Sequence, residues 1–319
     1  MSEIGHWEIK AFAAERVNLP KAKADEYRAQ VRGMRERLEK KISDDPNFDL
    51  VKMLHSGSVA KGTALRTIND LDVAVYVKAG NAPTDDKLLI PWLVARLREA
   101  NPNLDESQFL VQDHSVKVSF RGSGLDVDVA PVLFEGEAND YGVLIRKSGQ
   151  RVSTSIPRHL EFIRARKSLY GDDYAQLIRL TKWWKNVEWT RDSDFRMKSF
   201  LIELIWAHLA SVGVPLDDYP EAMSRFFGYL VKSKLCERIY FTDYYDAIKL
   251  PGATNEAIEI FDPVNPENNV AKNYFLADRE RIVSAAQNAM DAIGDAKWAT
   301  TKADAVDCLQ YILGPSFRG

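Results

Sequence analysis

The stretch GSVAKGTALRTINDLDVAV, residues 57–75, carries the strongest indication of how the first half of this chain folds. A Gly-Ser turn opens it, and apolar and polar residues alternate over Leu71–Val77, which predicts a β-strand. Because side chains alternate across a strand, Asp70 and Asp72 are expected to project from the same face. The stretch therefore predicts two carboxylates side by side on a strand that follows a small-residue turn.

A second pair of acids follows in a predicted hairpin. Residues 115–120 alternate in polarity, a turn rich in glycine follows at 121–124, and residues 125–133 form the second predicted strand. Asp126 and Asp128 share one face of that second strand. We therefore expect four carboxylates on strands of one sheet.

The rest of the chain is mostly helical in pattern. Apolar residues recur at helical spacing over 21–43. Further predicted helices are 83–100, 160–167, 174–187, 200–212, 219–231 and 279–293, and Asp262–Val270 is expected to turn into a helix near Asn268. Strands followed by helices predict an α+β fold with two lobes: residues 1–157, holding the catalytic sheet, and residues 158–319, a helical lobe. The N-terminal helix is expected to act as a spine beside both lobes.

Composition excludes several classes of protein. The 319 residues are 45% hydrophobic and 28% charged, with a net charge of −3, which is typical of a globular protein and not of a disordered one. Cys236 and Cys308 are far apart in the sequence and favour neither a disulfide framework nor a zinc site. No signal peptide or membrane-spanning run is visible, so we expect a cytoplasmic protein with no membrane partner.

Basic charge is concentrated in one segment despite the near-neutral sum. Residues 158–198 contain ten Lys or Arg and six Asp or Glu. A local excess of this kind favours binding of a phosphate-bearing ligand over a basic surface that covers the whole protein.

Carboxylates arranged in this way suit hard divalent cations. Two such ions about 4 Å apart can clamp both the attacking and the leaving oxygen of a phosphoryl transfer. Asp70 and Asp72 would contact both ions, and Asp128 or Asp126 would complete the site. The Gly57-Ser58 turn would supply backbone N–H groups and a hydroxyl to phosphate oxygens.

These motifs, in this order, resemble a known catalytic core. Gly57-Ser58, Asp70-Leu71-Asp72 and Val127-Asp128-Val129-Ala130-Pro131 resemble the polymerase-β-like nucleotidyltransferases. Leu180–Trp184, Lys198–Leu204 and Asp262–Pro266 are similar to motifs of the oligoadenylate-synthase-like branch, which includes the bacterial cGAS/DncV-like nucleotidyltransferases, or CD-NTases.

The resemblance implies roles for particular residues. It implies that Asp70, Asp72 and Asp128 are the catalytic residues and bind two Mg²⁺ ions, with Mn²⁺ as an alternative. The third catalytic Asp of the family precedes a hydrophobic pair and a Pro, which selects Asp128 over Asp126. Gly57, Ser58, Lys182 and Ser199 would bind the ATP phosphates.

Phe12–Pro20, Ser119–Asp128 and Asp262–Val270 look most like the clades that make cyclic trinucleotides in anti-phage (CBASS) operons. The resemblance thus implies a cyclic oligonucleotide made from ATP, such as cyclic tri-AMP or cyclic AMP-AMP-GMP with GTP as a second substrate, and release of pyrophosphate. Partners of the family are HORMA-domain activators or ubiquitin-like conjugation enzymes that act on the C-terminal residue, here Gly319. Activation by nucleic acid is left open.

Other interpretations stay open at this point. The chain could be an RNA terminal nucleotidyltransferase of the CCA-adding or poly(A) type, or a nucleotide-binding pseudoenzyme on the same fold. Asp126 could be a structural carboxylate or a partner of the basic segment. Lys182 could be a lysine on a core helix with its charge at the surface, and Ser199 an N-cap residue. The tryptophans near Lys182 suit a helix core better than a base-stacking surface.

Overall fold

The computed structural model describes the chain except for residues 1–3, 44–49, 69, 79 and 81. Contacts divide the chain into two compact units. We call Leu19–Ile163 the sheet unit, and Met1–Asn18 together with Arg164–Gly319 the helical unit. The predicted lobes, 1–157 and 158–319, differ from these units mainly in that the first 18 residues group with the helices.

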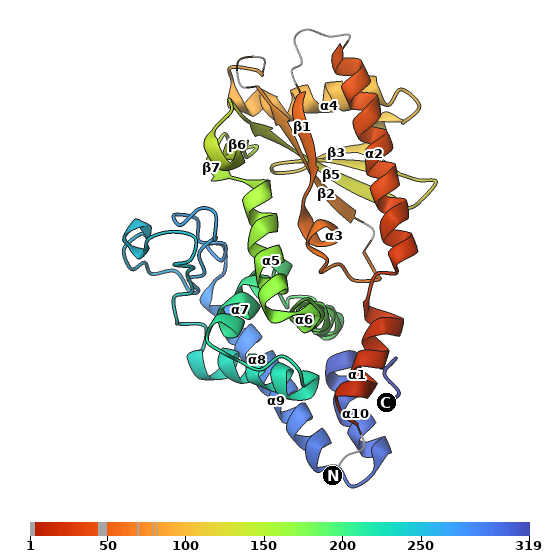
Figure 1. The fold of residues 1–319 in the computed structure, drawn as a ribbon, viewed down its shortest axis with the longest axis vertical. Helices are drawn as coiled ribbons and strands as arrows, with labels where there is room; N and C mark the ends of the chain where they lie inside the picture. Colours follow the sequence, from red (N-terminus) through yellow and green to blue (C-terminus); the bar gives the residue numbers. More distant parts are fainter. Residues whose placement is uncertain (1–3, 44–49, 69, 79, 81) are drawn as a thin grey trace. The chain divides into compact units, whose positions relative to one another are not determined.

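The sheet unit is built on one mixed sheet (Figure 1). Its strands in the described residues are β1 Leu50–His55, β2 Asp70–Val77, β3 Phe109–Val111, β4 Val116–Phe120, β5 Leu125–Leu133, β6 Gly142–Ile145 and β7 Arg151–Thr154. The order is β1-β2-β5-β4-β3, and β6 pairs with β5 and β7. The pair β2 and β5 is parallel, and the other pairs are antiparallel. The predicted hairpin is confirmed as β4 and β5.

Helices α2 (Lys21–Ser43) and α4 (Leu89–Ala100) belong to this unit, together with the short α3 (Gly57–Lys61) and the first half of α5 (Ile156–Tyr170). Short 3₁₀ turns lie at Asp86–Leu88, Glu106–Gln108 and Ala138–Asp140. The apolar faces of α2 and α4 pack against every second residue of β2 and β5. The buried members of this core include Val31, Met34, Leu93, Leu97, Leu71, Val73, Val75, Val127 and Val129.

Alternation along β2 puts the acids on the other face of the sheet. Leu71, Val73 and Val75 enter the core beneath α2 and α4, whereas Ala74 and Tyr76 belong to a separate apolar cluster with Val132 and Phe134. Because successive side chains of a strand point to opposite faces, Asp70 and Asp72 share the face of Ala74 and Tyr76. The carboxylates therefore lie on the face opposite the main core, as the alternation predicts.

The helical unit contains α1 (His6–Phe12), which continues as a π-helix over Ala13–Val17, the second half of α5, then α6 (Asp172–Arg191), α7 (Ser199–Ser211), α8 (Tyr219–Ser233), α9 (Leu276–Trp298) and α10 (Lys302–Leu313). A short 3₁₀ turn lies at Ala247–Lys249. The predicted α+β architecture is confirmed. The helix expected near Asn268 is wrong, because turns occupy that segment and α9 begins only at Leu276.

Large aromatic side chains fill the core of the helical unit. Trp184 and Trp206 are fully buried, and the Trp206 ring stacks on Phe226 with 5.0 Å between centroids. The Trp206 Nε1–H donates to Thr181 Oγ1 at 2.9 Å, so its polar atom is satisfied inside the core. The prediction that tryptophans serve the core holds for these two, whereas Trp189 is exposed.

A polar cluster explains why the first residues group with the helical unit. Asn18 Oδ1 accepts hydrogen bonds from Arg179 Nε at 2.8 Å and from Gln176 Nε2 at 3.1 Å. Earlier in the chain, Phe12 lies edge-on to Phe317, which is fully buried. These contacts involve residues more than 150 positions apart, which local sequence patterns do not reveal. Within the described residues, no helix is both long enough and apolar enough to cross a membrane.

We predict that Leu93→Ala lowers the free energy of unfolding of the sheet unit by about 2–5 kcal/mol, because Leu93 is fully buried beneath the sheet. Leu88→Ala is the matched control, since Leu88 precedes the same helix and is 52% exposed, and its change should stay within about 0.5 kcal/mol. Urea unfolding followed by circular dichroism measures both. Equal losses in the two variants would contradict the core described here.

Candidate functional site

The register of two parallel strands brings the acidic motifs together. Asp70 on β2 pairs with Asp126 on β5, and Asp72 pairs with Asp128. Residues that are paired across neighbouring strands share a face of the sheet. The four carboxylates predicted from sequence therefore lie side by side on adjacent strands.

The Gly-Ser motif lies against the second of these acids. Gly57 begins α3 with a left-handed φ of 67°, and the backbone N–H of the preceding Ser56 donates to the Asp72 carbonyl oxygen at 2.9 Å. A Cβ placed on Gly57 would lie 1.8 Å from Asp72 Oδ2. Glycine is therefore required twice, for its backbone conformation and for the close approach of the carboxylate. Ser58 follows as the second residue of the same short helix.

One of the four carboxylates, that of Asp128, has an oxygen without a hydrogen-bond partner in the described part of the chain. Its Oδ1 is buried and accepts no hydrogen bond from any residue that the structure describes. Burial raises the pKa of this carboxyl above its ordinary value; the charge of Lys117 opposes that shift, and those of Asp70 and Asp126 add to it. A buried carboxylate oxygen without a partner is costly, and a bound cation would relieve that cost.

These residues fit a divalent cation that also binds its substrate. Carboxylate oxygens are the ligands that Mg²⁺ prefers, and the ion usually keeps only one or two of them, with water and substrate phosphates completing its shell. Among the described residues, no three His, Cys, Asp or Glu side chains converge into a ready-made cluster. The arrangement of these acids therefore suits an ion whose ligands include substrate phosphate oxygens better than an ion bound by protein side chains alone.

Asp126 has a partner that the sequence did not suggest. Lys117 Nζ on β4 donates to Asp126 Oδ2 at 3.2 Å, and both side chains are about three-quarters buried. The ion pair of Asp126 is thus with Lys117 of the neighbouring strand, which suits a structural carboxylate, and the alternative of a partner in the basic segment 158–198 stays a prediction. Lys117 could have been found from its place opposite Asp128 in the predicted hairpin.

In the helical unit, Lys182 is a core residue with a buried counter-charge. Its Nζ donates to Glu203 Oε1 at 2.6 Å, and each side chain is only 3% exposed. The alternative of a lysine whose charge reaches the surface is therefore wrong. Glu203, on α7, lies within the Lys198–Leu204 motif, but the sequence predicted a role only for Ser199 of that motif.

Ser199 is the first residue of α7 and is not its N-cap. The N-cap residue is Lys198, and the Ser199 hydroxyl accepts a hydrogen bond from Lys185 Nζ at 3.3 Å. Lys185 lies three residues after Lys182 on α6. The two lysines of α6 thus contact two different residues of the first turns of α7.

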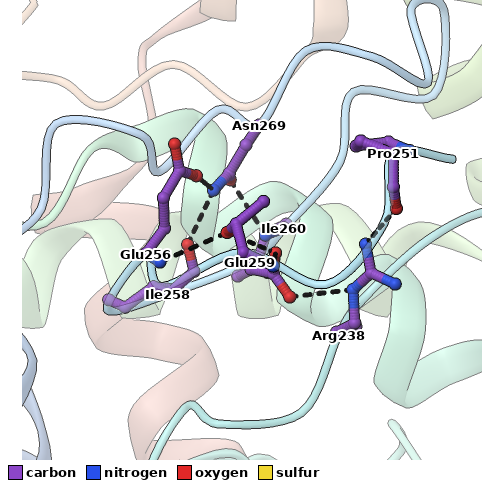
Figure 2. Close-up of polar contacts among 8 residues, drawn as sticks. Arg238, Pro251, Glu256, Ile258, Glu259, Ile260 and Asn269 are labelled. Carbon is purple, nitrogen blue, oxygen red and sulfur yellow. Dashed lines mark hydrogen bonds and ion pairs between the residues drawn. The ribbon is translucent and has the colours of Figure 1, made fainter.

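The segment around Asp262 forms turns whose polar side chains hydrogen-bond within the segment. Asp262 accepts hydrogen bonds from Val264 N and from Asn268 Nδ2. Figure 2 shows the neighbouring Asn269, whose side chain donates to Ile258 O at 2.8 Å and accepts from Ile260 N at 3.1 Å. These contacts lie within one loop region and give it a structural role.

Figure 2 also shows how the preceding segment is attached to the same region. Arg238 forms an ion pair with Glu259 at 2.8 Å, and its guanidinium donates to the Pro251 carbonyl at 2.8 Å. Glu256 accepts a hydrogen bond from Asn269. The polar groups of this loop are therefore used to hold one another.

Comparisons with known proteins find curated relatives that match almost the full chain. No protein-family model matches the chain. It is 47% identical over 317 residues to the cyclic AMP-AMP-AMP synthase of Escherichia coli strain MS 115-1, with 99% of this chain and 98% of that protein covered. It is 30% identical over 318 residues to the CBASS oligonucleotide cyclase CdnC of Escherichia coli strain KTE188, with coverages of 98% and 96%.

Solved structures of one of these kinds of protein also match the chain. Structures of E. coli MS115-1 CdnC, one with ATP and one in complex with HORMA-deltaN, match with a TM-score of 0.91 and 47% identity over 99% of both chains. The Vibrio cholerae DncV cyclic AMP-GMP synthase is 12% identical and matches with a TM-score of 0.72 over 98% of this chain and 96% of that one. This last likeness concerns the fold alone.

We predict that Lys182→Met or Glu203→Leu alone destabilises the helical unit by about 3–5 kcal/mol, because each removes one partner of an ion pair whose side chains are only 3% exposed. The double variant should lose clearly less than the sum, since no charge is then left buried. Urea unfolding of the four proteins measures this coupling.

The control for this cycle is Arg225→Met, which breaks the exposed pair between Arg225 and Glu221 on α8. Exposed pairs contribute about 0–1 kcal/mol, so its effect should be small. Strict additivity of the Lys182 and Glu203 variants would argue against a coupled buried pair.

Proposed function

Since the chain belongs to the CBASS oligonucleotide cyclases, we propose that the acidic face of its sheet joins ATP molecules into a cyclic trinucleotide. The protein is a nucleotidyltransferase that makes a cyclic oligonucleotide second messenger in anti-phage defence. The proposal of a product built from adenosine alone rests on the relative that is 47% identical, a cyclic AMP-AMP-AMP synthase.

The observation that carries the proposed chemistry is the parallel register of β2 and β5. It aligns Asp70 and Asp72 with the strand that bears Asp128, whose Oδ1 is buried without a partner in the described structure. We assign Asp70, Asp72 and Asp128 the role of holding Mg²⁺, with Mn²⁺ as an alternative. Bound there, the metal would neutralise the charge that develops on the phosphate oxygens.

The residues of the chain then have distinct tasks. Gly57 lets the Asp72 carboxylate approach the start of α3, and Ser58 offers a hydroxyl to phosphate oxygens. Ser199, in the helical unit, is proposed to bind the triphosphate as well. Lys182 is proposed to do so by exchanging its contact with Glu203 Oε1 for a phosphate oxygen. In each step the 3′-hydroxyl of one nucleotide attacks the α-phosphorus of another, an O–P bond forms, and pyrophosphate leaves. We assign Asp128 the acceptance of the proton from that hydroxyl.

The alternatives weighed from sequence find less support. An RNA terminal nucleotidyltransferase shares the catalytic acids, but the curated relatives that match over almost the full chain are named as cyclases or as a cyclic AMP-AMP-AMP synthase. A pseudoenzyme would not require the close approach of Gly57 to Asp72.

A HORMA-domain protein is the proposed partner, since a relative that is 47% identical forms a complex with HORMA-deltaN. Use of GTP, a ubiquitin-like conjugation enzyme acting on Gly319, and a cytoplasmic location stay predictions from sequence.

We predict that the protein, given ATP and Mg²⁺, forms a small phosphatase-resistant product whose mass is that of a cyclic oligoadenylate. Mass spectrometry identifies the ring size and the bases, and each reaction is run with and without the HORMA protein of the Escherichia coli relative. Lengthening of an added RNA primer, with no cyclic product, would overturn the proposal in favour of an RNA nucleotidyltransferase.

The matched control for that reaction is Asp70→Asn combined with Asp72→Asn. The variant should fold, since both side chains are exposed, yet lose product by several orders of magnitude, because the carboxylates that hold the metal are gone. Synthesis near the wild-type level by this variant would refute the assignment of these acids.

We also predict that Gly57→Ala lowers the rate of product formation at least about a hundredfold, because the added Cβ would displace the Asp72 carboxylate. Gly62→Ala is the matched control: Gly62 ends the same helix with a similar φ of 73°, but nothing lies within 4 Å of the position that its Cβ would take. Backbone strain is common to both variants, so a difference in rate isolates the contact with Asp72. Equal rates would show that this contact does not matter.

A further inference from the structure

One lysine lies among the aspartates of the acidic face. Lys117 on β4 is in direct register with Asp128 on β5, and the next residue on the same face of β4, Ser119, is in register with Asp126. Directly paired residues share a face. Three adjacent strands therefore present four carboxylates and one ammonium on the same side of the sheet.

The ammonium of Lys117 forms an ion pair with Asp126, the one of the four acids that is not proposed to bind metal. Lys117 Nζ lies 3.2 Å from Asp126 Oδ2, and the two side chains are 27% and 25% exposed. A pair sheltered to this extent is screened less by salt than a pair on the open surface. The Asp126 carboxylate is thus engaged within the protein.

Asp128, directly across from Lys117, keeps its buried Oδ1 without a hydrogen-bond partner in the described residues. The lysine nevertheless acts on it through its charge, which also reaches Asp70. The contact with Asp126 and the charge near Asp128 are two separate effects of one side chain.

We propose that Lys117 is a positioning residue of the acidic face: it engages Asp126 so that this carboxylate does not bind metal, and its charge beside Asp128 weakens the binding of divalent cations when no nucleotide is present. The inference rests on the proposed function, because it takes Asp70, Asp72 and Asp128 as the metal ligands.

This arrangement favours a metal ion that arrives with its nucleotide. The ammonium repels a free divalent cation, whereas the negative charge of a triphosphate offsets that repulsion when both bind together. Without Lys117, the four carboxylates would lose the ammonium that is in register with Asp128, and the face would attract a cation more strongly by itself. The lysine therefore couples metal binding to the presence of a polyphosphate.

The test measures binding of Mn²⁺ alone, without nucleotide, from the electron paramagnetic resonance signal of the free ion. Lys117→Met should bind Mn²⁺ about tenfold more tightly than the wild type, because the repulsion is gone and Asp126 becomes available. Lys117→Arg, which keeps the charge, should stay within about twofold of the wild type. Lys40→Met, which removes an exposed ammonium from α2, is the control and should leave the affinity unchanged.

A second comparison tests the role of Asp126. Asp128→Asn should abolish measurable Mn²⁺ binding, whereas Asp126→Asn should weaken it by no more than about threefold. A simple folding defect would weaken binding and could not tighten it, so a gain in Lys117→Met is specific to the proposed role. An unchanged or weaker affinity in Lys117→Met, or equal losses in the two Asn variants, would overturn the inference.

The outcomes separate this inference from the proposed function. If the wild type makes a cyclic product but the Mn²⁺ affinities do not follow this order, only the role of Lys117 is wrong. If the affinities follow this order but ATP gives no cyclic product, the proposed function is wrong and the role of Lys117 in cation binding stands. Should Lys117→Met fail to fold, the comparison of Asp126→Asn with Asp128→Asn decides alone.

Discussion

The parallel pairing of β2 with β5 is the constraint on which the candidate site depends. It is the one parallel pair that the described sheet contains, and it sets Asp70 beside Asp126 and Asp72 beside Asp128. A slip of one residue in either strand would turn its acids toward α2 and α4 and its valines toward solvent. The hydrophobic core beneath the sheet therefore fixes the register, and the register fixes the carboxylates. The alternation of side chains along β2 and β5 thus provides both the buried core on one face and the carboxylates on the other.

Much of this arrangement follows from short patterns in the sequence. Alternation over Leu71–Val77 and over the hairpin predicts both strands and the face of each acid, because a strand has a strict period of two. The apolar spacing predicted the ends of helices α6 to α9 to within five residues. The order of the motifs, carried by a family resemblance, predicted the class of enzyme.

What the sequence did not predict depends on contacts between distant residues. The cluster of Asn18 with Gln176 and Arg179 joins positions about 160 residues apart, and no local pattern indicates it. Glu203 lies within the Lys198–Leu204 motif, but its ion pair with Lys182 was not predicted, because the two residues lie 21 positions apart on different helices. The expected helix at Asn268 failed because the side chains of Asp262 and Asn269 hydrogen-bond to the backbone and hold the segment in turns.

Each unit also supplies counter-charges of its own for charged groups at or beside the residues proposed to act on ATP. In the sheet unit Lys117 pairs with Asp126, and in the helical unit Glu203 pairs with Lys182. A buried charge that waited for a ligand to neutralise it would weaken the free protein by several kcal/mol. Internal pairing reduces that cost and holds these four side chains in place before metal or nucleotide binds, whereas Asp128 Oδ1 has no such partner among the described residues. Such preorganisation reduces the rearrangement needed when the substrate arrives, which is the condition for electrostatic catalysis of phosphoryl transfer.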